Sequence, residues 1–184
     1  MFKTKHFIIS LITACAATIA PSAQATELMD RHQSLWNDLE RVGVTIRVND
    51  PQACRSRSFQ GRYISRQRRL DVCQDNYAPY TQTQWTANDL DTLRHEAHHV
   101  LQDCTGGNPY DSVLNKFFTD DDYQSFVANS LTPQQIKSVI SSYRSGGANE
   151  HIIALELEAF SVARTVSADL IGRKLIEFCG VSKM

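Results

Sequence analysis

The stretch TANDLDTLRHEAHHVLQDCTGG, residues 86–107 of this 184-residue chain, predicts a long amphipathic helix. Thr86 can cap its start together with Asp89, because a hydroxyl and a carboxylate at this spacing satisfy the first backbone N–H groups. Apolar residues then recur at three- and four-residue spacing, as on one face of a helix. They are Leu90, Leu93, Ala97, Val100 and Leu101, and Gly106-Gly107 breaks the pattern. One face is therefore left for polar residues.

That stretch also carries His95-Glu96-Ala97-His98-His99. Two imidazoles four residues apart on a helix can bind one zinc ion, with the intervening glutamate close to the metal-held water. Zinc lowers the pKa of this water to roughly 7 and polarises a carbonyl, while the glutamate takes a proton and passes it to the leaving amine. We therefore expect zinc-dependent peptide-bond hydrolysis, with His95 and His99 as ligands and Glu96 as general base. His98 points to another side of the helix, where it would be exposed or would support a ligand.

Residues 95–107 resemble the motif helix of the thermolysin-like gluzincins, a family of zinc metallopeptidases. Asp103, Thr105 and Gly107 stand at the family's offsets after the motif, and Val100-Leu101 replaces its Ala-Val. The resemblance implies a zincin helix, but the chain is too short for the two-lobed architecture of that family. Short strands ending in a cysteine and followed by the motif helix also resemble small uncharacterised bacterial and cyanobacterial metallopeptidases.

A catalytic zinc site needs a third protein ligand and one open position. Metzincins would place a third histidine at position 105, which is Thr105 here, so that class is excluded. The aspzincin pattern makes Asp111, after Tyr110, a candidate, although a loop or capping role is the favoured interpretation. Gluzincins take a glutamate from a second helix, and residues 154–160 offer Glu156 and Glu158.

Helical geometry favours Glu156 over its close alternative Glu158. At 100° per residue, Glu156 falls on the apolar face and Glu158 points toward Thr165 and Asp169. A carboxylate on a buried face costs several kcal/mol unless it is paired or metal-bound. Glu156 is therefore expected to bind the zinc, with a buried salt bridge to an arginine as the structural alternative. Glu156-x-x-Ala159 also resembles the Glu-x-x-Ala-Asp of membrane-associated gluzincins, but Phe160 replaces the aspartate, so a histidine ligand needs support from elsewhere.

The rest of the chain predicts an α+β, zincin-like fold: a small antiparallel sheet, the motif helix and a mostly helical C-terminal half. Hydrophobic spacing predicts a helix over 27–42 and strands over 44–48, 59–64 and 69–73. Further helices are expected near 120–129, 133–144 and 149–171, with Thr119 and Thr132 as caps. Leu70 to Cys73 is expected to be the edge strand that lines the cleft. Tyr110, Tyr143 and His151 are unranked candidates for stabilising an oxyanion.

Residues 1–25 have the features of a secretory signal peptide. Lys3 and Lys5 precede an apolar run over 7–20 and the site Ala23-Gln24-Ala25. The run is shorter than the roughly 20 residues of a transmembrane helix, so we expect no membrane span. The sequence predicts a secreted or periplasmic chain, cleaved after Ala25, with one domain over 26–184. Alternatively, residues 12–15 resemble a lipoprotein box, in which Cys15 would be lipidated.

The mature chain would keep Cys54, Cys73, Cys104 and Cys179, an even number in an oxidising compartment. Two disulfides are expected, and the spacing alone does not select their pairing. A hairpin between Cys54 and Cys73 favours that pair and leaves Cys104 for Cys179. Metal binding by these thiols is disfavoured because no Cys-x-x-Cys spacing occurs.

Charge gives no indication of a nucleic-acid partner, because 19 Lys and Arg stand against 20 Asp and Glu. Six arginines gather over residues 55–69, at positions 55, 57, 62, 66, 68 and 69, and we interpret them as a solvated hairpin face. The alternative to an enzyme is a non-catalytic zinc-binding or scaffold protein that retains the zincin fold. Glu96 argues against it, because a structural zinc site needs no general base. Substrate specificity and oligomeric state are not predicted.

Overall fold

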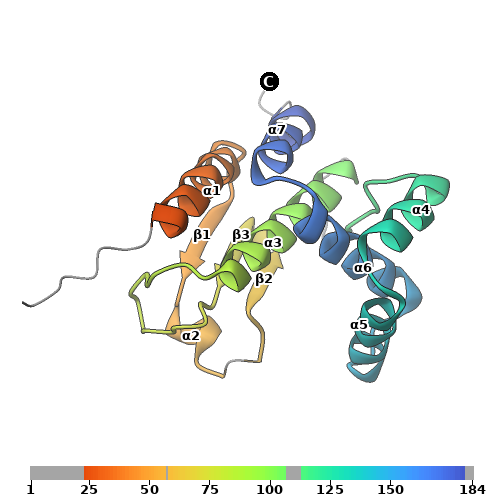
Figure 1. The fold of residues 1–184 in the computed structure, drawn as a ribbon, viewed down its shortest axis with the longest axis horizontal. Coiled ribbons are helices and arrows are strands. Elements are labelled where there is room, and N and C mark those ends of the chain that lie inside the picture. The colour runs from red at the N-terminus through yellow and green to blue at the C-terminus, as the bar shows by residue number, and fades with distance from the viewer. Residues whose placement is uncertain (1–22, 57, 107–112, 181–184) are drawn as a thin grey trace, which may run out of the picture.

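The structure, a computed structural model, describes residues 23–56, 58–106 and 113–180. A three-stranded sheet packs against helices, and the C-terminal half is helical (Figure 1). The expected α+β class is therefore confirmed. In chain order the elements are α1 (Ala23–Arg41), β1 (Thr45–Val48), α2 (Pro51–Cys54), β2 (Gly61–Ile64), η1 (Ser65–Gln67), β3 (Arg69–Val72), α3 (Ala87–Thr105), α4 (Asp120–Ser130), α5 (Pro133–Ser145), α6 (Glu150–Thr165) and α7 (Ala168–Cys179).

Several expectations concern residues outside this description. They are the signal peptide as far as residue 22, the lipidation alternative at Cys15, Arg57, Tyr110 and Asp111. Within the described ranges, no helix combines the length and the hydrophobicity that a membrane crossing requires.

The sheet has the order β1-β3-β2 and is mixed, so the expected antiparallel sheet is wrong. β1 runs parallel to β3, and β2 runs antiparallel to it. The chain passes through α2 and β2 before it returns as β3, and this crossover lets β3 run in the same direction as β1. The expected edge strand is also wrong. β3 is central, with Leu70 and Val72 fully buried, and β2 is the edge strand beside α3.

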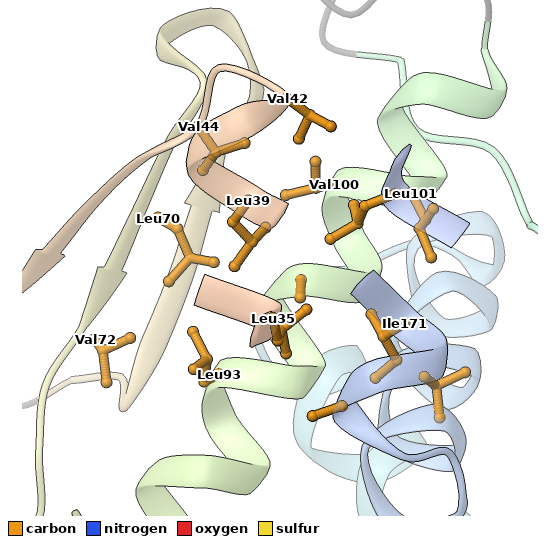
Figure 2. Packing of buried hydrophobic residues seen from close by; sticks show 14 of the residues in the cluster. Leu35, Leu39, Val42, Val44, Leu70, Val72, Leu93, Val100, Leu101 and Ile171 are labelled. Atoms are coloured by element: carbon orange, nitrogen blue, oxygen red, sulfur yellow. The ribbon is translucent and has the colours of Figure 1, made fainter. Parts of the chain in front are cut away.

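The main core lies between the sheet, α1, α3 and α7. Leu35 and Leu39 of α1 meet Leu70 and Val72 of β3 and Leu93 of α3 (Figure 2). α3 contacts β2 and β3 as well as α6 and α7, so the motif helix lies at the centre of the fold. A second core joins α4, α5 and α6 through Val127, Leu131, Ile153 and Leu157.

The predicted helix starts are present. The Thr86 hydroxyl accepts from the backbone N–H of Asp89, and the Asp89 carboxylate accepts in return from the N–H of Thr86. Thr132 and Gln135 form the same reciprocal pair at the start of α5, and at the start of α4 the Thr119 hydroxyl accepts from the N–H of Asp122. The single helix expected over 149–171 is instead two helices, α6 and α7. Val166 is extended, and the Ser167 side chain accepts from the N–H of Leu170 to start the new helix.

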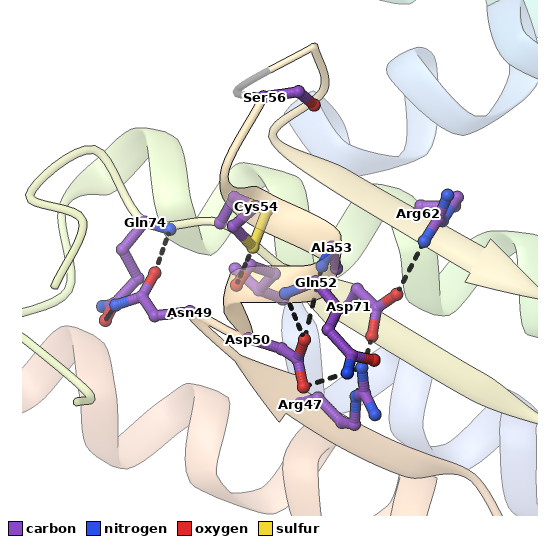
Figure 3. Close-up of a disulfide and its surroundings, with 12 residues drawn as sticks. Arg47, Asn49, Asp50, Gln52, Ala53, Cys54, Ser56, Arg62, Asp71 and Gln74 are labelled. Carbon is purple, nitrogen blue, oxygen red and sulfur yellow. Dashed lines mark hydrogen bonds and ion pairs between the residues drawn. A yellow bond between two sulfur atoms is a disulfide. The ribbon is translucent and has the colours of Figure 1, made fainter. Parts of the chain in front are cut away.

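Two disulfides are present, Cys54–Cys73 and Cys104–Cys179, which is the pairing that the hairpin argument favoured. The first joins α2 to the residue after β3 (Figure 3), and the second joins the end of α3 to the end of α7. Such bonds are typical of proteins in oxidising compartments.

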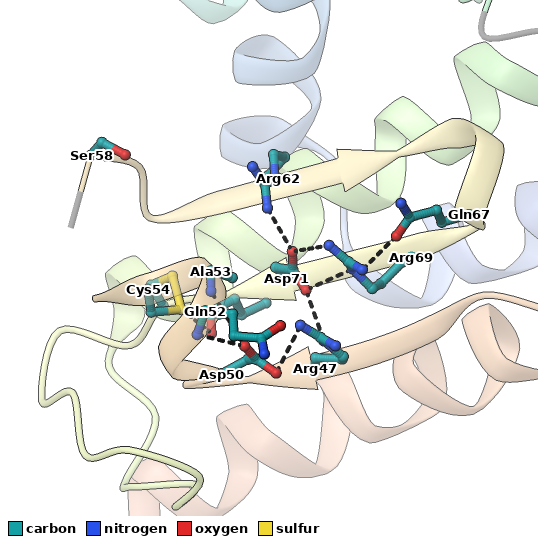
Figure 4. Close-up of polar contacts among 12 residues, drawn as sticks. Arg47, Asp50, Gln52, Ala53, Cys54, Ser58, Arg62, Gln67, Arg69 and Asp71 are labelled. Carbon is teal, nitrogen blue, oxygen red and sulfur yellow. Dashed lines mark hydrogen bonds and ion pairs between the residues drawn. A yellow bond between two sulfur atoms is a disulfide. The ribbon is translucent and has the colours of Figure 1, made fainter. Parts of the chain in front are cut away.

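The arginines of the sheet are more ordered than a solvated face implies. Arg47, Arg62 and Arg69 surround the fully buried carboxylate of Asp71 (Figure 4). Arg68 is itself buried and donates to the Val42 carbonyl. Their charge is therefore partly used in holding the three strands together.

Candidate metal centre

The contact between α3 and α6 brings His95, His99 and Glu156 together. The Nε2 atoms of the two histidines are 3.1 Å apart. Glu156 Oε2 lies 3.1 Å from His95 Nε2, and Oε1 lies 3.6 Å from His99 Nε2. One donor atom from each residue thus lies within 4.8 Å of the others, in a group that could hold a metal ion.

These distances fit zinc. Bonds of 2.0–2.2 Å in a tetrahedral arrangement separate neighbouring ligand atoms by about 3.4 Å. The separation of 3.1 Å between the two histidines, and those of 3.1 and 3.6 Å from them to the two different oxygens of Glu156, lie on either side of that value. The His99 Nδ1–H donates to Gln102 Oε1 over 2.7 Å, which leaves the Nε2 lone pair for the centre. The residues present therefore suit the ion that the motif predicts.

Glu156 and the histidines beside it change each other's pKa values. Burial raises the pKa of Glu156, but hydrogen bonds from His95 and His99 outweigh it and hold this pKa well below its usual range. Burial lowers the pKa of His99, while its contacts with Glu156 outweigh this and raise it to about 9. A negative carboxylate thus faces the two imidazoles.

Glu96 lies in the same region and is not one of the three converging groups. It is buried, with 6% of its surface exposed. Burial raises its pKa, and this exceeds the lowering by His95, by His99 and by a hydrogen bond from the backbone N–H of Tyr63. Since Tyr63 belongs to β2, the edge strand holds the carboxylate in place.

Glu158, the alternative ligand, lies elsewhere in the structure. It is fully buried and accepts hydrogen bonds from His98, Gln102 and the backbone N–H groups of Phe117 and Phe118. The helical-face argument therefore selected the residue that meets the histidines, but its premise was wrong, because Glu158 is the more buried carboxylate. His98 is also fully buried, so of its two expected settings, exposed or supporting a ligand, the exposed one is wrong.

A cleft of about 590 Å³ opens beside the centre. His95, Glu96 and Thr92 of α3 form its floor, and residues 58–61 of the edge-strand region form one wall. Tyr143, Phe160 and Arg164 are among the residues of α5 and α6 that line it. The Phe160 ring packs 4.4 Å from the His95 ring, centroid to centroid. Phe160 thus gives His95 an aromatic neighbour.

Tyr143 is the one of the three oxyanion candidates that the structure places at the cleft. Burial raises the pKa of its hydroxyl, and the charge of Glu156 together with a hydrogen bond to that carboxylate raises this pKa further. His151 is exposed and bonds the Leu114 carbonyl, while Tyr110 lies outside the described residues.

The edge strand presents backbone groups to the cleft. The Cys73 N–H donates to the Gln60 carbonyl, so the backbone of Gln60 faces the β3 side. In an antiparallel pair every second residue is hydrogen-bonded to the neighbouring strand, so the backbone groups of Arg62 also point toward β3. The backbone groups of Gly61 and Tyr63 therefore face away from β3, as the contact between Tyr63 and Glu96 shows independently.

Comparison of the chain with protein-family models, with curated proteins and with solved structures found no match.

Proposed function

We propose that this chain is a zinc-dependent peptidase, with His95, His99 and Glu156 as ligands and Glu96 as general base. The observation that carries the proposal is the convergence of the three ligand atoms at a cleft that also holds a separate buried glutamate. A structural zinc site is closed by four protein ligands, whereas a catalytic one keeps a position open. Three ligands beside a cleft support the catalytic interpretation over a non-catalytic zinc protein.

Zinc in such a site supplies Lewis-acid chemistry, lowering the pKa of a water molecule and polarising a carbonyl. Glu96 is held by the Tyr63 N–H and takes the proton of the attacking water, then donates it to the leaving amine. The Tyr143 hydroxyl is the candidate donor to the oxyanion that develops on the scissile carbonyl.

Substrate binding uses the edge strand. Gly61 lines the cleft and turns its backbone away from β3, so an extended peptide can pair with β2 as an added strand. The scissile bond would then pass over the floor formed by His95 and Glu96. The two disulfides support an extracytoplasmic location for this activity.

Replacing Glu96 by Gln tests the proposal. The variant should keep about one zinc ion per chain, because Glu96 is not among the three ligands. It should lose hydrolysis by at least the roughly 10²–10⁴-fold that a general base contributes. Metal analysis and mass spectrometry of a digested peptide library measure the two properties. Glu150→Gln, the same change at an exposed position of α6, is the control and should alter neither.

Three results would count against the proposal. Unchanged cleavage by Glu96→Gln would remove Glu96 from the mechanism. A wild-type chain that holds zinc and cleaves no peptide of the library would favour the non-catalytic alternative. A wild-type chain that binds no zinc would remove the metal centre itself.

A further inference from the structure

A buried chain of hydrogen bonds runs from His99 into the protein. Its first link joins His99 Nδ1 to Gln102 Oε1 over 2.7 Å. The Gln102 Nε2 group then donates to Glu158 Oε1 and to the Leu155 carbonyl, each at 3.0 Å. Gln102 and Glu158 have no exposed surface. The chain thus connects a proposed ligand on α3 with the backbone and a carboxylate of α6.

The Gln102 amide can adopt only one orientation in this setting. Its NH₂ group has two acceptors, the Leu155 carbonyl and the Glu158 carboxylate. A flipped amide would turn its carbonyl oxygen toward these two acceptor oxygens and leave that buried amide oxygen without a donor, which costs about 1–3 kcal/mol. Gln102 Oε1 is therefore held toward His99 as an acceptor.

Glu158 is fixed in turn by donors from other elements. His98 Nε2 lies 2.7 Å from Glu158 Oε1, and the Phe117 N–H donates to the same oxygen over 2.9 Å. The Phe118 N–H donates to Oε2 over 3.2 Å. Because these donors occupy both carboxylate oxygens, Glu158 stays an acceptor for Gln102 and is not turned to the metal centre.

We propose that Gln102, oriented by Glu158 and Leu155, is a positioning residue that keeps the His99 proton on Nδ1 and its Nε2 lone pair toward the metal. This inference rests on the proposed zinc site. An acceptor behind a ligating histidine fixes both the tautomer and the orientation of the ring. Gln102 lies about one turn after His99 on α3, so the motif helix itself supplies this acceptor.

Gln102→Met tests the proposal, because methionine fills similar space and offers no comparable acceptor. Zinc affinity, measured by competition with a chelator, should fall by roughly 10–100-fold. In metal-free protein, at a pH high enough for the His99 ring to be neutral, ¹⁵N chemical shifts of that ring should show the proton on Nδ1 in wild type and a new population with the proton on Nε2 in the variant. Gln102→Glu keeps an acceptor for His99, so it should retain more zinc affinity than Gln102→Met despite facing Glu158.

The matched control is Gln74→Met. Gln74 is also fully buried, but its partners are Asn49 and Thr83, which are not part of the metal centre. It should lower the thermal midpoint without a comparable loss of zinc affinity. The inference is overturned if Gln102→Met binds zinc as wild type does, or loses no more affinity than Gln74→Met. A neutral His99 ring in wild type with its single proton on Nε2 would overturn it too, even if Gln102→Met fails to fold. If wild type binds no zinc, the proposed function fails instead.

Discussion

One side chain of α5 reaches the candidate metal centre. Tyr143 of α5 contacts Glu156 of α6 and lines the cleft that His95 and Glu96 also line. A hydroxyl that donates to a developing oxyanion stabilises it, and the loss of such a donor lowers kcat by roughly 10²–10³-fold in well-studied cases. Tyr143 is therefore the residue on which the proposed mechanism can be tested apart from metal binding.

Tyr143→Phe removes only the hydroxyl and should lower kcat by about 10-fold or more, because an oxyanion donor is lost. Zinc content should not change, since Tyr143 is not in the ligand group. His151→Phe is the control from the same set of sequence candidates, and it should cleave at the wild-type rate because His151 bonds Leu114 outside the cleft. Steady-state kinetics with a cleavable peptide measure both. Equal kcat for Tyr143→Phe and wild type would remove Tyr143 from catalysis.

The sequence predicted the three motif residues, but it did not predict the groups that contact the nearby carboxylates. His95, Glu96 and His99 follow from local spacing, because one helix places them. The environment of Glu158 could not be foreseen, since its donors Phe117 and Phe118 lie about 40 residues away in sequence and its partner His98 lies on another helix. A helical projection assumes one buried face, whereas α6 packs against α3, α4 and α5.

At the scale of the elements, β2 and α3 lie very close to each other at Gly61. A Cβ atom built there would lie 2.5 Å from Thr92 Cγ2 and 2.7 Å from Glu96 Cγ, both on α3. Only glycine lets the edge strand lie this close to the motif helix. The Tyr63 N–H, two residues along, can therefore reach the Glu96 carboxylate.

Gly61→Ala should push β2 away from α3 or displace Glu96. A misplacement of about 1 Å can cost 10²-fold in rate, so a loss of that order is expected while zinc remains bound. Gly43→Ala is the control: it strains a residue at φ +86°, where the nearest atom outside its chain neighbours is 3.9 Å away. That variant should lower the unfolding free energy but keep the turnover number of the remaining folded protein. Wild-type turnover by Gly61→Ala would show that this packing does not position Glu96.

The sequence predicted where the strands lie, but it did not predict how they pair. Alternating apolar residues located all three, because a half-buried strand has a period of two. Their pairing was not predictable from that pattern, since Leu70 and Val72 alternate in the same way whether β3 is central or at an edge. The break between α6 and α7 did carry a local signal, the serine cap at Ser167, which the continuous apolar spacing concealed.

Over the whole molecule, α3 carries one end of a disulfide and two of the three proposed zinc ligands. One disulfide ties its last turn to the end of α7, 75 residues later in sequence. The proposed zinc ties its middle to Glu156 of α6. Both cross-links join helices that already pack against each other. Metal binding should therefore add to the stability of one cooperative unit, and the fold should not depend on it.

Zinc should therefore raise the thermal midpoint of the metal-free protein. A free zinc concentration of about 100 times Kd adds roughly 2.7 kcal/mol, which corresponds to a shift of about 5–10 °C for a domain of this size. Excess chelator should reverse the shift, and differential scanning calorimetry measures both. Glu156→Ala should show almost no shift, because it loses a ligand oxygen, whereas Glu150→Gln should shift as wild type does. An equal shift in Glu156→Ala and wild type would mean that zinc binds elsewhere on the molecule, since mass action stabilises only through the site that holds the ion.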